Sequence, residues 1–151
     1  MAIITCACGK ARNWGYDEIR SEKREFASNR LRYLKADPLR GIELEFIQTA
    51  NATKAYLNLH SFHKTDRKDL LVTFEAGGQA RSSSAYVLAG GQRVLLSEEI
   101  AEWLMQTLKE GHSVHVQLPG YRQVVDAAGF AHKLKRMQHP LPVGNPFRLP
   151  Y

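Results

Sequence analysis

The stretch GIELEFIQTA, residues 41–50, gives the chain a period of two. In it the apolar residues Ile42, Leu44 and Phe46 alternate with two glutamates, a pattern typical of a strand with one buried side and one wet side. The stretch KAYLNLHSF, residues 54–62, alternates in the same way after a short turn-like sequence. Together the two stretches predict an antiparallel hairpin.

Further stretches repeat this period along the chain. Residues 70–76, 83–90 and 92–97 add three short strands, so that five predicted strands follow one another. Such a succession predicts an antiparallel meander with one solvent-facing side. Residues 112–118 and 121–126 alternate again on either side of a Pro-Gly turn and predict one more pair of strands.

The clearest helix is predicted over residues 98–110. Ser97 is a good N-cap, two glutamates follow in the first turn, and Gly111 stands at the exit. Residues 128–137 predict a short closing helix. The expected fold class is therefore α+β, with a mostly antiparallel sheet of about five to seven strands packed against one main helix (98–110).

The rest of the chain is less patterned. Residues 1–40 are polar and basic and are predicted to be an N-terminal spacer, with a short helix over 17–27. Residues 42–137 are expected to form a single globular domain. Residues 138–151 are rich in proline and predict an extended tail.

Charge divides the 151-residue chain unevenly. The net charge is +6, but the first 40 residues and the last 20 each carry +4, whereas the middle carries −2. No apolar run approaches the roughly 20 residues of a transmembrane helix. Two basic ends favour contact with an anionic membrane surface or with nucleic acid. The candidate contact residues are Arg30, Arg32, Lys35, Lys133, Lys135 and Arg136.

The two cysteines, Cys6 and Cys8, stand one residue apart near the start of the chain. Zinc sites usually show paired C-x-x-C spacings, and a disulfide across one residue closes a strained ring. The segment IITCACGK resembles the end of a bacterial lipoprotein signal, in which a short apolar stretch and small residues precede an acylated cysteine. The resemblance implies lipidation at Cys8 or Cys6. An inert N-terminus and metal or redox chemistry are the other interpretations.

Motifs that carry catalysis or bind cofactors are not found. His60 and His63, and likewise His112 and His115, have an H-x-x-H spacing, but they stand on predicted strands or turns, where residues three apart point to opposite faces. The serines of RSSSAY are not in a G-x-S-x-G motif. No catalytic residue, cofactor or metal is therefore assigned.

These features favour a non-enzymatic bacterial cell-envelope protein. In this hypothesis a lipid anchor holds the domain at the membrane, facing the periplasm or the surface, and the folded part binds another envelope protein. The alternative is a cytoplasmic, basic nucleic-acid-binding module. A small hydrolase without a recognisable motif is the third hypothesis.

Overall fold

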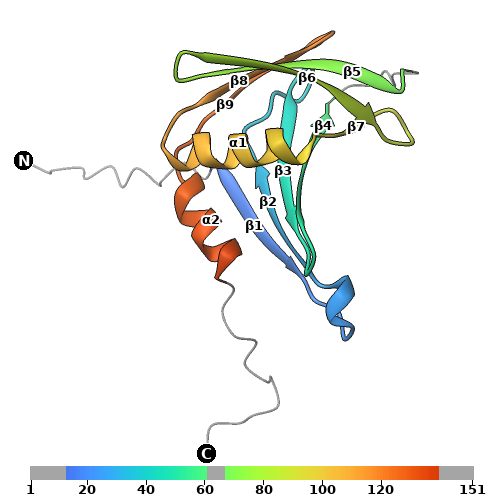
Figure 1. Ribbon diagram of the computed structural model, residues 1–151, viewed down its shortest axis with the longest axis vertical. Coiled ribbons are helices and arrows are strands. Elements are labelled where there is room, and N and C mark those ends of the chain that lie inside the picture. The colour runs from blue at the N-terminus through green and yellow to red at the C-terminus, as the bar shows by residue number, and fades with distance from the viewer. Residues whose placement is uncertain (1–12, 61–66, 140–151) are drawn as a thin grey trace, which may run out of the picture.

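The computed structural model describes residues 13–60 and 67–139 and contains one nine-stranded antiparallel sheet (Figure 1). The strand order is β1-β2-β3-β4-β7-β6-β5-β8-β9. The strands are β1 (Trp14–Ile19), β2 (Ser28–Tyr33), β3 (Ile42–Gln48), β4 (Thr53–Leu59), β5 (Asp69–Ala76), β6 (Gln79–Val87), β7 (Arg93–Leu95), β8 (Val114–Leu118) and β9 (Tyr121–Val125). The helices are η1 (Arg24–Phe26, a 3-10 turn), α1 (Glu98–Lys109) and α2 (Phe130–Gln138).

The sheet bends into two arms that β7 joins (Figure 1). One arm consists of β1 to β4, and the other consists of β5, β6, β8 and β9. The three-residue strand β7 pairs with β4 on one side and with β6 on the other, and Leu95 lies opposite both Tyr56 and Tyr86. Helix α1 lies in the angle between the arms and packs against β4 and β8.

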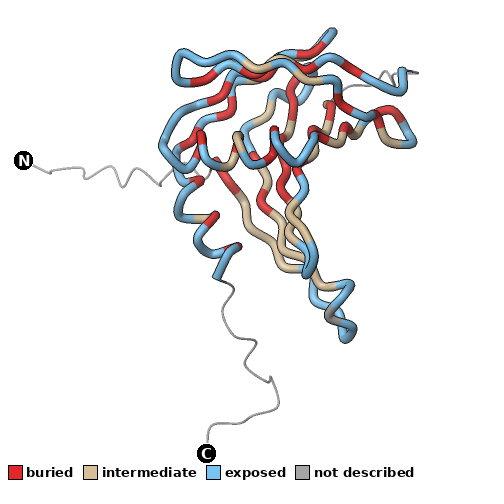
Figure 2. The backbone as a smooth tube through the Cα atoms, in the orientation of Figure 1, coloured by how far each residue is buried: buried red, intermediate tan, exposed pale blue. Residues whose placement is uncertain are grey.

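Alternation along the strands builds the core in that angle. Ile42, Leu44 and Phe46 of β3 have no exposed surface, and Leu57 of β4 faces the same interior. Figure 2 shows buried residues recurring along both arms and on the helices. Helix α2 covers β1 and β2, the part of the first arm that α1 does not reach.

Trp14 is the centre of an aromatic cluster in this core. Its ring centroid lies 4.8 Å from that of Phe130, 5.4 Å from that of Tyr33 and 6.3 Å from that of Phe46. Its indole Nε1–H donates a 2.8 Å hydrogen bond to the carbonyl oxygen of Asp126, just after β9. The first strand is thereby fixed to the end of the last one.

The predicted architecture is wrong in its strand number and its layers. The prediction was a sheet of five to seven strands against one main helix at 98–110, whereas the structure has nine strands and two short helices on different parts of the sheet. The predicted meander is also wrong, because β4 pairs with β7 rather than with β5. Alternation determines which side of a strand is buried, but it does not determine the neighbouring strand.

The segment predicted as a spacer contains two strands. Residues 14–33 form β1 and β2, which pair with each other and, through β2, with β3. The predicted helix over 17–27 is replaced by the end of β1 and by η1. Leu31 and Tyr33 point inward while Arg30 and Arg32 point outward, so this stretch has the period of two that its many charges obscure.

Helix α1 and the last two strands occur where they were predicted, whereas the strand predicted over 83–90 is β6, which begins earlier and ends at Val87. Helix α1 begins after Ser97, whose side chain accepts a hydrogen bond from the backbone N–H of Ile100. The hairpin of β5 and β6 turns at Gly77 and Gly78, both with positive φ, as a two-residue hairpin turn requires. Of the tail predicted over 138–151, Gln138 ends α2 and residues 140–151 lie outside the described residues, as do both cysteines.

Candidate binding surfaces

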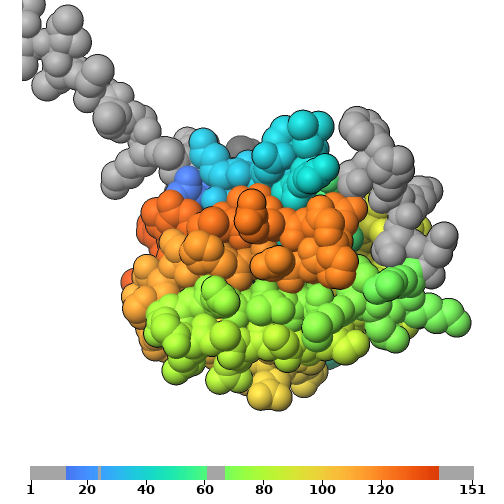
Figure 3. All heavy atoms as spheres, turned by 90° about the horizontal axis from the view of Figure 1, so that it is seen from above, coloured from blue at the N-terminus to red at the C-terminus, as the bar shows by residue number. Residues whose placement is uncertain are grey.

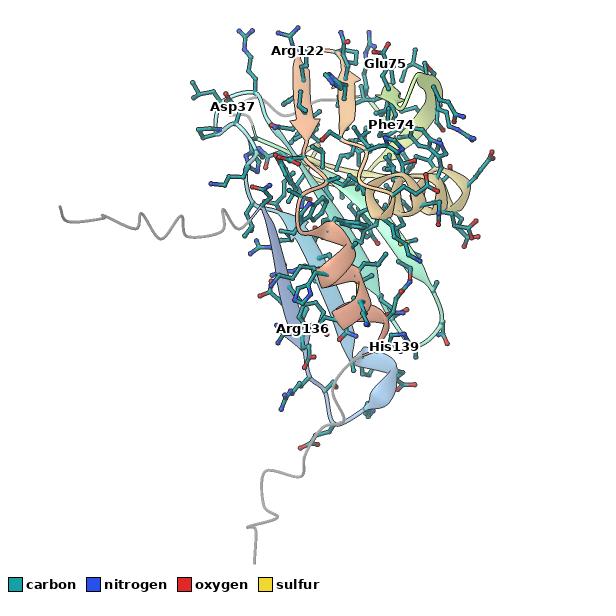
Figure 4. The ribbon with its side chains drawn as sticks, turned by 90° about the vertical axis from the view of Figure 1, so that its left-hand side faces the viewer. Asp37, Phe74, Glu75, Arg122, Arg136 and His139 are labelled. Atoms are coloured by element: carbon teal, nitrogen blue, oxygen red, sulfur yellow. The ribbon has the colours of Figure 1, made fainter. Side chains whose placement is uncertain are left out.

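The six cations predicted as contact residues do not form one surface. Arg30 and Arg32 lie on the outer side of β2, away from the core. Lys133, Lys135 and Arg136 belong to α2, which covers the inner side of β1 and β2. Figure 4 shows Arg136 beside the long strands, far from Arg122 at the other end of the molecule. The sheet itself separates the two predicted basic groups.

Arg136 has a local partner. Its guanidinium lies 4.8 Å from the ring centroid of Tyr16, whose hydroxyl donates a 2.8 Å hydrogen bond to Glu18. Burial, together with the Glu18 carboxylate, raises the pKa of Tyr16 to about 12, although the charge of Arg136 acts in the opposite direction. This contact joins α2 to β1, while Arg136 itself remains exposed.

On the outer side of the first arm, hydrogen bonds and ion pairs surround Glu45. This carboxylate, only 4% exposed, accepts a 2.7 Å hydrogen bond from Asn58 and a 3.3 Å one from Arg93. Arg30 lies 3.7 Å away on its other side. The sequence predicted Glu45 on a wet face, but Arg30 of the adjacent strand β2 and Arg93 of β7, two strands away, cover it. We call Arg30, Arg32, Glu45, Asn58 and Arg93 the outer charged face.

Each arginine of the outer charged face is fixed in place. Arg93 lies 4.0 Å over the ring of Tyr56, and Arg30 pairs with Asp17 at 3.0 Å. Arg32 approaches Asp17 through Nε at 3.7 Å. The Nε atoms of all three arginines are buried and have no hydrogen-bond partner. Their side chains are nevertheless still partly exposed, at 31–39%.

A second surface lies where the loop before β3 meets the hairpin of β8 and β9. A hollow of about 430 Å³ separates them, and Asp37, Arg40, Tyr121 and Arg122 are among the residues that line it. Figure 3 looks down on this region, where the loop, in blue to cyan, adjoins the orange hairpin. In Figure 4 Asp37 and Arg122 lie at the same end of the molecule.

Backbone contacts hold the two sides of the hollow together. The N–H of Arg122 donates to the carbonyl oxygen of Arg40 at 3.4 Å, and the N–H of Asp37 donates to the side-chain oxygen of Gln123 at 3.0 Å. The Asp37 carboxylate accepts hydrogen bonds from the N–H groups of Leu39 and Arg40, which lower its pKa. The charged Asp37 carboxylate therefore stabilises the conformation of its own loop through these hydrogen bonds.

The cations at this end lack such carboxylate partners. Within residues 13–60 and 67–139, Lys35, Arg40 and Arg122 form no ion pair, and all three are exposed. Lys35 was predicted as a contact residue, whereas Arg40 and Arg122 were missed. Arg122 follows the predicted Pro-Gly turn and Arg40 directly precedes the first alternating stretch, but no local pattern shows that these two places meet.

The histidines are dispersed. His60 lies 3.7 Å from Glu43 at the rim of the first arm, His112 and His115 are exposed, and His63 lies outside the described residues. In the part of the chain that the structure describes, no group of three or more His, Cys, Asp and Glu side chains could hold a metal ion. A second hollow, of about 420 Å³, adjoins Glu75 and His115 at the turn between β5 and β6.

Comparison of the chain with protein-family models, with curated proteins and with solved structures finds no match. Among the described helices, none is long and apolar enough to cross a membrane. The geometry of the two surfaces is therefore the basis for an assignment of function.

Proposed function

We propose that this protein is a non-enzymatic domain of the bacterial cell envelope that binds another envelope protein through its outer charged face. The observation that carries the proposal is the fixed position of Arg30 and Arg93 around the buried carboxylate of Glu45, with Arg32 paired to Asp17 beside them. Arginine is enriched at the energetic centres of protein interfaces, where fixed charges select a partner of complementary pattern.

The acids of this face favour a protein partner over nucleic acid. Asp17, Glu43 and Glu45 alternate with the arginines across β1, β2 and β3. A polyanionic backbone would meet these carboxylates as well as the cations, whereas a protein can match both signs. Binding of nucleic acid is one of the outcomes that the test below distinguishes.

Lipidation at Cys8, or at Cys6, is the second part of the proposal. It is based on the resemblance of IITCACGK to a lipoprotein signal. Cys8 precedes Asn13, the first described residue, by only a few positions, so an extended chain between them spans at most about 18 Å. An acylated cysteine would thus keep the Asn13 end of the domain close to the bilayer.

The anchor is tested on the native protein. Cells that make it are fractionated, and the mass of its N-terminal peptide is measured. We expect a membrane-bound peptide that begins at an acylated Cys8 or Cys6. An unmodified thiol in the soluble fraction would contradict the anchor.

The binding face is tested by cross-linking in the same cells. A photoreactive residue replaces Lys54, which is exposed on the outer side of β4, and in a matched strain it replaces Ser84 on the other arm. We expect a discrete cross-linked protein from position 54 only, and we expect Arg32→Ala to abolish it. Lys135→Ala on α2 is the matched control and should leave the product unchanged.

Two outcomes would contradict this use of the face. One is a product that survives Arg32→Ala, provided that the variant melts like the wild type. The other is binding of a single-stranded oligonucleotide that Arg32→Ala weakens and that falls steeply with salt, because this is the behaviour of a phosphate contact.

A further inference from the structure

We infer that the end of the molecule formed by residues 34–40 and the β8–β9 hairpin docks on anionic phospholipid headgroups. The inference deepens the proposed function and rests on its envelope location, but it does not depend on acylation. The residues that carry it are Leu34, Lys35, Leu39, Arg40 and Arg122, which we call the membrane-facing end.

The charge at this end is not neutralised by side chains. Lys35, Arg40 and Arg122 are exposed and have no ion pair within the described ranges. The carboxylate of Asp37, which also lines the hollow, keeps its charge and accepts backbone N–H groups of its own loop, so the three cations outnumber this acid. Unpaired cations are attracted to an anionic lipid surface, and this attraction grows with their number.

Apolar side chains accompany these cations. Leu39 is 67% exposed and Leu34 is 45% exposed, although both are large and hydrophobic. They lie in the same short loop as Lys35 and Arg40. Apolar side chains that enter the boundary between headgroups and acyl chains, with cations beside them, are the usual means of binding at a membrane surface.

The hollow gives this end a place for a headgroup. Its volume of about 430 Å³ is in the range of small-molecule sites, and it opens between Arg40 and Arg122. The guanidinium group binds phosphate oxygens in pairs, so two arginines on facing sides can hold one phosphate. Tyr121 and Gln117 add polar groups to the lining.

The start of the described chain lies at the same end. The carbonyl oxygen of Asn13 accepts a 2.7 Å hydrogen bond from the N–H of Leu34. A tether that enters the domain at Asn13 would therefore bring Leu34 and its loop toward the bilayer. The tip of the β1–β2 hairpin lies at the far end of these strands and would be held away from the bilayer (Figure 1).

The test uses the full chain with Cys6→Ser and Cys8→Ser, so that acylation cannot contribute. The probes are vesicles of phosphatidylcholine alone and vesicles with about one quarter phosphatidylglycerol, in about 0.1 M salt, and bound protein is measured by sedimentation. We expect binding to the anionic vesicles only. Arg40→Gln with Arg122→Gln should weaken it about 25-fold, from about fivefold for each arginine.

Two further variants separate the contributions. Leu39→Gln keeps the charge and should weaken binding roughly tenfold, because an apolar side chain no longer enters the membrane. The matched control is Lys54→Gln with Lys135→Gln, which removes as much charge from exposed positions elsewhere and should change binding less than about twofold. Because all five side chains are exposed, the melting temperature should not change.

Three results would overturn the inference. These are a wild-type chain that does not bind anionic vesicles, a control variant that loses as much affinity as the arginine variant, and an oligonucleotide that displaces the vesicles through Arg40 and Arg122. None of these readouts involves the outer charged face or the N-terminal mass. A failure here is therefore distinct from a failure of the proposed partner or anchor.

Discussion

The arginines of the outer charged face and those of the membrane-facing end differ in their partners. Arg30 and Arg93 lie within 4.0 Å of the buried carboxylate of Glu45, and Arg93 also stacks on Tyr56. Arg40 and Arg122 are linked through their backbones only, and their side chains remain in solvent. A fixed charge pattern suits a protein partner, whereas a fluid lipid surface requires only mobile, unpaired charge.

This comparison predicts its largest effect on folding at Glu45. The substitution Glu45→Ala leaves Arg30 and Arg93 without their shared, buried carboxylate and should lower the free energy of unfolding by about 3 kcal/mol. Glu43→Ala is the control, since Glu43 is more exposed and should lose less than about 1 kcal/mol. Urea denaturation measures both. Equal losses would mean that Glu45 is an ordinary surface acid.

The second prediction compares one arginine from each region. Arg93→Ala removes a hydrogen-bonded ion pair with Glu45 and the contact with Tyr56, and it should cost about 2 kcal/mol of unfolding free energy. Arg122→Ala removes an exposed, unpaired side chain and should change stability by less than about 0.5 kcal/mol. If Arg122→Ala proves as costly as Arg93→Ala, the distinction between the two regions is lost.

The smallest effect concerns Asp37 and its pH dependence. The N–H groups of Leu39 and Arg40 lower the pKa of this carboxylate in the folded state, so its stabilising effect is present above the unfolded value of about 3.9 and is lost as pH falls through the folded pKa. Asp37→Ala should therefore be slightly less stable than the wild type at neutral pH. The difference should shrink progressively as the pH falls below the unfolded value of about 3.9. A difference that persists in acid would assign the effect to the backbone of the loop.

The sequence predicts the strands that alternate clearly and the helix with clear caps. Ile42, Leu44 and Phe46 identify β3, and Ser97 with Gly111 identifies α1. Prediction from the sequence fails over residues 14–33, because the charged residues on the outer side of β1 and β2 obscure the alternation of buried and exposed positions. Trp14 preceded the expected fold, yet it is 2% exposed and belongs to the core.

The two candidate binding surfaces are harder to predict because they depend on strand order. Glu45 has the sequence pattern of a wet residue, and it is buried only because β2 and β7 bring Arg30 and Arg93 beside it. Arg40 and Arg122 are distant in the sequence and meet only after the sheet has bent. The local alternation of apolar and polar residues predicts neither the burial of Glu45 nor the contact between Arg40 and Arg122.

The contacts of Trp14 have a consequence for aggregation. An open sheet has two edge strands with unpaired backbone groups, which can pair with another chain. Here the indole of Trp14, at the start of β1, is hydrogen-bonded to Asp126 beside the end of β9, and the backbone of Arg122 in β9 is bonded to Arg40. The hydrogen bond of Trp14 thus joins the two edge strands at one end, and we expect its loss to favour pairing of their free edges with another copy.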